Sequence, residues 1–199
     1  GNVLDGLSPA KGIRVGQASP EKNKVFLEKH ELDQLEHLET KYQPLKQAYL
    51  FASYSAITRS ELLELKWGDF SHDKENDKWY VNVKRQKTGK PARLLVSEKA
   101  MSFILPKGSN DEFVFKVKIH SYNKQQLKWI MLDAGIRKQP ITFHTSKNYF
   151  ASMFFRKNKG RHLGSLMKAL QHNNLSTTQR YLNSLLGGEI MEEGASLDF

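Results

Sequence analysis

The chain has 199 residues, with 31 Lys and Arg against 21 Asp and Glu, and its formal net charge is +10. It contains no Cys, which excludes disulfide bonds, thiolate metal sites and a thiol nucleophile. Its longest uncharged stretch, residues 47–58, is shorter than the roughly 20 apolar residues that a membrane span needs. We expect a cytoplasmic protein without a membrane partner. The charge favours a nucleic acid as partner over a merely solvated basic surface.

The first half of the chain predicts a leader and then helices. Residues 1–25 are interrupted by Gly and Pro and show no apolar periodicity, which is typical of a linker. A polar helix is expected to begin near residue 28, and a more apolar helix to cover residues 44–56. Thr58 and Glu61 have the spacing of a capping box, which predicts a further helix start.

The second half adds a hairpin and more helices. Alternation of apolar and polar residues over 78–96 predicts a β-hairpin with a basic turn. Helical patterns follow over residues 121–134, 144–156 and 163–170. Ser176 and Gln179 then repeat the capping-box spacing and predict a short helix with Tyr181 in its second turn. The expected fold class is therefore α+β, mainly helical with a small antiparallel β-sheet.

Several enzyme classes find no support in the sequence motifs. The acidic run at residues 73–77 imitates the opening of a calcium loop, but Lys78 and Lys84 stand where the loop needs Gly and Glu. A solvated turn is the better interpretation of this run. No zinc-protease motif, P-loop or nucleophile elbow occurs in the chain.

A set of cations, imidazoles and one phenol remains as candidate chemistry: Lys87, His144, Lys147, His172 and Tyr181. This set suits phosphoryl transfer without a metal, because cations and imidazoles can supply the donors that phosphate oxygens require. Tyr is a poor nucleophile at its ordinary pKa of about 10 and needs a base. Taken singly, a His or Tyr is more often a half-buried packing residue.

Four segments carry a family resemblance when taken together and in order. They are residues 51–70 with Ser-Glu-Leu-Leu at 60–63, residues 87–95, residues 144–151, and residues 170–181 with the sequence LQHNNLSTTQRY. The chain resembles the catalytic domain of tyrosine recombinases, or phage-type integrases, and most of all those of Bacteroides-type mobile elements.

The resemblance implies site-specific DNA recombination or integration through a 3′-phosphotyrosyl intermediate. Tyr181 would be the nucleophile, Lys87 the acid on the leaving 5′ oxygen, and His144 an aid to proton transfer, while Lys147 and His172 would hold the phosphate. The resemblance implies no metal, no small-molecule cofactor, double-stranded DNA as partner, self-association in a tetrameric synapse on DNA, and the bacterial cytoplasm as location.

The chain departs from the family at both arginine positions. The first falls on Thr58, and Arg59 is displaced by one residue, which turns a side chain by about 100° around a helix. The second falls on Lys147, which keeps the charge but lacks the planar fork of Arg. The alternative is therefore a catalytically impaired pseudo-recombinase that binds DNA. A second rival is a metal nuclease with carboxylate ligands.

The resemblance also implies a domain organisation. Residues 1–25 would be the linker remnant from a missing N-terminal DNA-binding domain, residues 26–185 the catalytic domain, and residues 186–199 a C-terminal tail.

Overall fold

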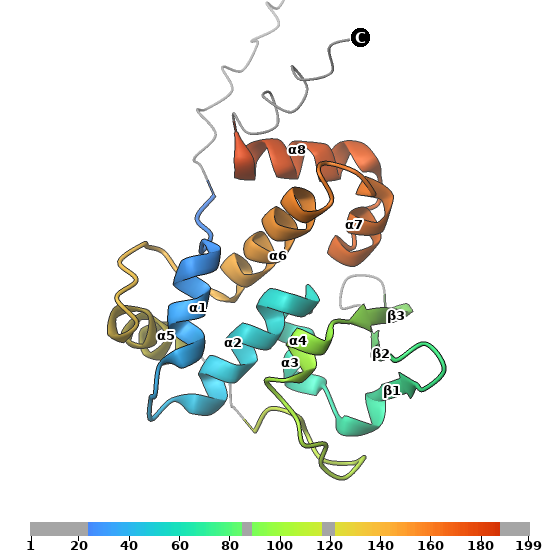
Figure 1. The fold of residues 1–199 in the computed structure, drawn as a ribbon, viewed down its shortest axis with the longest axis horizontal. Helices are drawn as coiled ribbons and strands as arrows, with labels where there is room; N and C mark the ends of the chain where they lie inside the picture. The colour runs from blue at the N-terminus through green and yellow to red at the C-terminus, as the bar shows by residue number, and fades with distance from the viewer. Residues whose placement is uncertain (1–23, 85–88, 117–121, 188–199) are drawn as a thin grey trace, which may run out of the picture.

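The computed structural model describes residues 24–84, 89–116 and 122–187, which form a mainly helical domain with one small sheet (Figure 1). The helices are α1 (Lys29–His37), α2 (Gln43–Ser55), α3 (Arg59–Glu64), α4 (Glu98–Met101), α5 (Tyr122–Asp133), α6 (Phe143–Lys157), α7 (Leu163–Leu170) and α8 (Leu175–Leu186). The antiparallel sheet has the order β1 (Phe70–Asp73), β2 (Lys78–Lys84), β3 (Pro91–Val96). The predicted α+β class is confirmed. None of the helices in these ranges is long and apolar enough to cross a membrane.

Helix α2 lies at the centre of the domain, as Figure 1 shows, because it is apolar on more than one side. One side places Phe51 in a cluster with Val81 of the sheet. Another side places Tyr49 in a second cluster with Ile130 of α5 and Tyr149 of α6. Burial of such side chains is the main stabilising contribution to the fold, at roughly 25 cal/mol per Å² of apolar surface.

A third cluster joins α6, α7 and α8, the helices that carry most of the candidate site residues. Phe155 of α6, Leu166 and Leu170 of α7, and Leu182 and Leu185 of α8 are all buried in it. Tyr181 packs against the same cluster while remaining partly buried. The positions of His144, Lys147, His172 and Tyr181 therefore depend on the packing of these three helices.

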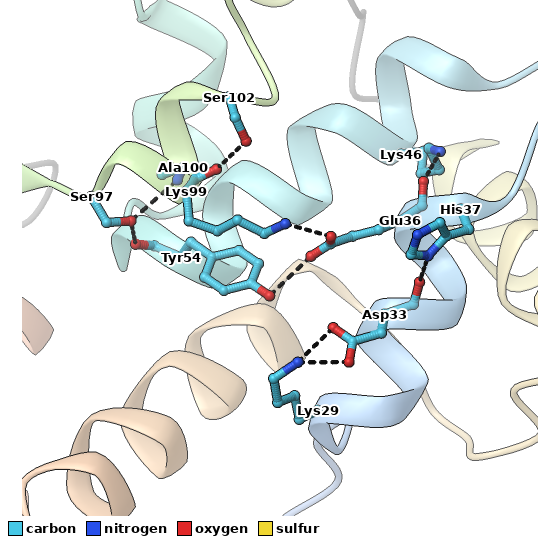
Figure 2. Close-up of polar contacts among 10 residues, drawn as sticks. All are labelled: Lys29, Asp33, Glu36, His37, Lys46, Tyr54, Ser97, Lys99, Ala100 and Ser102. Atoms are coloured by element: carbon cyan, nitrogen blue, oxygen red, sulfur yellow. Dashed lines mark hydrogen bonds and ion pairs between the residues drawn. The ribbon is translucent and has the colours of Figure 1, made fainter.

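Polar contacts fasten α1 and α4 to α2 (Figure 2). The Lys46 ammonium donates to the carbonyl oxygens of Glu36 at 2.9 Å and Leu38 at 2.6 Å, so a buried cation caps the C-terminal end of α1. The Glu36 carboxylate accepts from the Lys99 ammonium at 2.6 Å and from the Tyr54 hydroxyl at 3.0 Å. One carboxylate of α1 thus links α2 with α4.

The predicted helix cap is confirmed at Thr58 and wrong at Ser176. Thr58 caps α3 as predicted, and its backbone N–H donates to the Glu61 carboxylate at 2.8 Å. The cap of α8, however, is Asn174, whose side-chain oxygen accepts from the backbone N–H of Thr177 at 2.8 Å. Ser176 donates its own hydroxyl to the same oxygen. The helix begins two residues earlier than Ser176 indicated, and Tyr181 still lies in its second turn.

The hairpin of β2 and β3 is confirmed, with Val81 paired to Leu94. The structure adds β1, in which Phe70 pairs with Val81. The acidic run forms the turn between β1 and β2: the Asp73 carboxylate accepts from the backbone N–H of Glu75 at 3.1 Å. The interpretation of this run as a turn is confirmed.

Candidate active site

The first two turns of α6 place His144 and Lys147 three residues apart, on one face of the helix. Thr142 caps this helix and accepts from the backbone N–H of His144 at 3.2 Å. The Lys147 ammonium donates to the carbonyl oxygen of Leu170 at 2.8 Å, at the C-terminal end of α7. This bond ties the start of α6 to the segment that leads into His172.

The electrostatics of this turn favour a neutral imidazole. Desolvation, and after it the positive charges of Lys147 and Lys24, lower the pKa of His144. A neutral imidazole can accept a proton, whereas an imidazolium cannot. His144 is therefore suited to take a proton at neutral pH.

The connection from α7 to α8 brings His172 against Tyr181. Gln171 ends α7 in a left-handed conformation with φ of +63°, and His172 follows it. The His172 Nδ1 atom lies 3.0 Å from the hydroxyl oxygen of Thr178, which is fully buried. The His172 and Tyr181 rings meet edge to face, with centroids 5.4 Å apart and planes at 70°. The hydroxyl of Thr178 thus helps to hold an imidazole beside the phenol.

The Tyr181 hydroxyl is bonded to α6. It donates to the side-chain oxygen of Asn148, at 2.5 Å, and Asn148 is the residue that follows Lys147. The ammonium of Lys24 lies over the Tyr181 ring, 4.3 Å from its centroid. Burial raises the pKa of the Tyr181 hydroxyl above its ordinary value, so the phenol is protonated in this arrangement.

The first of the two substituted arginine positions, Thr58, lies at the start of α3 together with Arg59. Thr58 is engaged in the cap: its hydroxyl donates to the buried carboxylate of Glu61 at 2.8 Å. The other oxygen of Glu61 accepts from the Gln171 side chain at 2.9 Å. Arg59 follows Thr58 as the first residue of the helix and is exposed. The start of α3 is therefore connected to the segment that carries His172.

Contacts join α6, α7 and α8, the helices that carry most of the candidate residues. The His172 and Tyr181 rings touch, the Tyr181 hydroxyl is bonded to Asn148 of α6, and Lys147 is bonded to the end of α7. His144 lies three residues before Lys147, whose charge helps to lower its pKa. Lys87 lies outside the described residues, and so its position relative to the others is not part of this geometry. Over the ranges that the structure describes, no group of three or more His, Asp or Glu side chains could hold a metal ion.

Sequence reasoning missed the residues that hold this group together. Asn148 and Gln171 lie in segments that carry the resemblance but received no role there, and Glu61 was interpreted only as part of a helix cap. Lys24 was assigned to the leader, yet its ammonium contacts Tyr181. These contacts join segments far apart in the chain, which local patterns do not predict.

The fold is similar to that of solved tyrosine recombinases. The XerH site-specific recombinase bound to a palindromic difH substrate, in a post-cleavage complex, matches with a TM-score of 0.66 and 20% identity, over 88% of this chain and 54% of that one. The catalytic domain of bacteriophage HP1 integrase matches with a TM-score of 0.59 and 18% identity, over 86% of this chain and 94% of that one. The described fold is that of a tyrosine recombinase catalytic domain.

The sequence comparison names the family. The model described as "Phage integrase family" matches residues 25–186, and the chain belongs to this family. Among curated proteins, the tyrosine recombinase XerH of Campylobacter jejuni is 26% identical over 190 residues. That match covers 88% of this chain and 51% of the relative, so the chain spans about half the length of the curated relative.

Proposed function

We propose that the chain carries out site-specific DNA recombination by metal-independent strand cleavage and rejoining through a 3′-phosphotyrosyl intermediate. The observation that supports this most is the junction of α6, α7 and α8, where the His172 ring contacts Tyr181, the Tyr181 hydroxyl is bonded to α6, and Lys147 is bonded to the end of α7. The family to which the chain belongs supplies the reaction class. Lys87, which lies between β2 and β3 in the sequence, completes the proposed set.

In the proposed reaction the phenolic oxygen of Tyr181 attacks the phosphorus of a phosphodiester. The bond from phosphorus to the 5′ oxygen breaks, and the leaving 5′ oxygen takes a proton from Lys87. The phenolic proton passes to His144, whose neutral form is favoured by its lowered pKa. Lys147 and His172 donate to the phosphate oxygens and stabilise the charge that develops there. A 5′-hydroxyl from a second duplex then reverses the steps and rejoins the strand.

The arginine substitutions set the expected rate. Loss of one donor to a transition-state oxygen typically lowers a rate by about 100- to 1000-fold. Lys147 stands where the family has Arg, so a planar guanidinium that can hold two phosphate oxygens is replaced by a single ammonium. The Thr58 hydroxyl is already bonded within a helix cap. We therefore propose slow cleavage. The alternative is a relative that binds DNA without cutting it.

We also propose the partner, the assembly and the domain organisation in which this reaction takes place. The partner is double-stranded DNA, to which the net charge of +10 is suited, and the chain self-associates on it as a tetrameric synapse. A solved lambda integrase is a tetramer bound to a Holliday junction, with a TM-score of 0.62 to this fold and 16% identity, over 82% of this chain and 49% of that one. Residues 1–25 serve as a linker to a DNA-binding domain, residues 26–185 as the catalytic domain and residues 186–199 as a tail. The substrate is an end of a Bacteroides-type mobile element.

The experiment that tests this function is covalent trapping. The chain is incubated with nicked duplexes from the ends of the mobile element, in the presence of a chelator, and a protein–DNA band is sought on a denaturing gel. Tyr181→Phe should abolish the band, whereas the matched variant Tyr42→Phe, in the residue that caps α2, should not. Binding without a band, in every variant, would favour the pseudo-recombinase. Strand cleavage that needs Mg²⁺ and is lost in chelator, without a covalent band, would favour a metal nuclease.

A further inference from the structure

The residue that holds the Tyr181 hydroxyl has an orientation fixed by its other partner. The side chain of Asn148 is buried, with 2% of its surface exposed. Its Nδ2 group donates to the carbonyl oxygen of Val25 at 2.8 Å. A carbonyl oxygen can only accept, so the amide nitrogen must face Val25 and the amide oxygen must face Tyr181. The Tyr181 hydroxyl therefore donates its hydrogen to Asn148.

The residue before Val25 contacts Tyr181 from another direction. The ammonium of Lys24 lies over the phenol ring and donates to the hydroxyl oxygen of Ser184 at 2.5 Å. The Ser184 hydroxyl donates in turn to the backbone carbonyl of Tyr181 at 2.9 Å. The two residues that lead into the domain thus contact the ring of Tyr181 and orient the amide that binds its hydroxyl.

We propose that Asn148 is a positioning residue for Tyr181: its amide oxygen holds the phenolic hydroxyl against α6 and keeps it protonated before DNA arrives. The inference rests on the proposed role of Tyr181 as the nucleophile. An amide oxygen accepts a hydrogen bond without removing the proton, so the hydroxyl is aligned and unreactive at once. When a phosphodiester binds, the proton must transfer from this bond to a base.

The direct consequence concerns ionisation of the phenol. A hydrogen bond that the neutral form donates disfavours the phenolate, because the anion has no hydrogen to donate to the amide oxygen. Removal of the acceptor in Asn148→Ala should make Tyr181 easier to ionise. In Asn148→Asp a negatively charged acceptor takes its place, and a neighbouring negative charge also disfavours a phenolate.

Nitration by tetranitromethane, which reacts with ionised tyrosines, tests this in the DNA-free protein. The rate at each tyrosine is followed by mass spectrometry of peptides. Tyr181 should react about fivefold faster in Asn148→Ala, because the loss of one ordinary hydrogen bond shifts an equilibrium by about this factor. In Asn148→Asp it should react no faster than in the wild type. Asn158→Ala removes a comparable amide bond at the other end of α6 and should leave Tyr181 unchanged.

Comparison of Asn148→Ala with Asn148→Asp shows whether Asn148 acts on Tyr181 through its hydrogen bond or only through packing. If Ala and Asp accelerate nitration of Tyr181 equally, Asn148 acts only through packing and the proposal is wrong. An unchanged rate in Asn148→Ala overturns it as well. The fully buried Tyr49 serves as the internal reference for general loosening, and the rate of Tyr181 is taken relative to it.

The nitration result does not depend on strand cleavage, so the two proposals can fail separately. The predicted nitration pattern in a chain that never forms a covalent complex would preserve the positioning role and reject the proposed function. Where cleavage occurs, Asn148→Ala should slow covalent-complex formation at saturating DNA by about 10- to 100-fold, the effect of a misplaced reacting atom. The DNA concentration for half-maximal rate should not change.

Discussion

The buried carboxylate of Glu61 accepts hydrogen bonds from both Thr58 and Gln171, and so connects the start of α3 with the end of α7. The connection spans 110 residues of sequence. It places the substituted arginine position beside the segment that carries His172.

Glu61→Ala should lower the free energy of unfolding by about 1 to 3 kcal/mol, because it leaves the Thr58 and Gln171 donors without their acceptor. Chemical denaturation measures the change. Glu64→Ala removes an exposed carboxylate from the same helix and should change the free energy by no more than about 0.5 kcal/mol. Equal effects of the two substitutions would show that the Glu61 bonds do not stabilise the fold.

The pKa of His144 should depend on its cationic neighbours. Since the charge of Lys147 helps to lower this pKa, Lys147→Gln should raise it toward the ordinary value, and Lys24→Gln should raise it by less. NMR titration of the imidazole measures both shifts. Lys157→Gln, at the far end of α6, provides the control and should leave the titration unchanged.

The same depressed pKa has a consequence for stability. Because the folded state binds the His144 proton less tightly than the unfolded state does, acid favours unfolding. This destabilisation is absent above the ordinary His pKa of about 6.5. It grows as the pH falls from that value toward the lower pKa that His144 has in the folded state. His144→Gln should therefore lose less stability than wild type between neutral and mildly acidic pH. An equal loss in both proteins, measured by denaturation at each pH, would contradict this.

Restoring arginine should increase cleavage. Lys147→Arg provides a planar donor that can hold two phosphate oxygens, and the trapping assay should show a faster reaction, by up to roughly 100-fold. Thr58→Arg should also help, although it sacrifices a helix cap that contributes about 1 kcal/mol. The control variant Thr58→Ala measures the effect of losing the helix cap without adding an arginine. No gain from either arginine would contradict the alignment of these two positions.

The lysine that caps α1 gives a prediction about stability alone. Lys46→Met keeps most of the aliphatic side chain but leaves the carbonyl oxygens of Glu36 and Leu38 without their donor. The free energy of unfolding should fall by about 1 to 3 kcal/mol. Lys41→Met, at an exposed position before α2, is the control and should have little effect.

Local patterns in the sequence were sufficient for most of the helices and for the hairpin. Thr58 and Glu61 marked the start of α3 because a capping box is a contact within one turn. The cap of α8 was placed at Ser176 because the competing side chain of Asn174 was overlooked. Strand β1 has the sequence FSHD, with one large apolar residue, so it shows no alternation of apolar and polar residues that would predict a strand.

The site was predictable only in part, because its residues were selected by resemblance and its contacts by packing. The sequence indicated His144, Lys147, His172 and Tyr181, and among these four the structure shows a direct contact between His172 and Tyr181. Lys147 is bonded to the end of α7. The bond between Tyr181 and Asn148 joins residues 33 positions apart and follows from the docking of α8 on α6. No periodicity or motif encodes such a contact.

The central claim is that Tyr181 becomes covalently joined to DNA, and the site of attachment tests it most directly. Covalent complexes formed on a nicked duplex, in chelator, would be digested with nuclease and protease and analysed by tandem mass spectrometry. The account predicts a nucleotide 3′-phosphate on Tyr181. A nucleotide on another residue, or DNA binding without any adduct even in Lys147→Arg and Thr58→Arg, would contradict it.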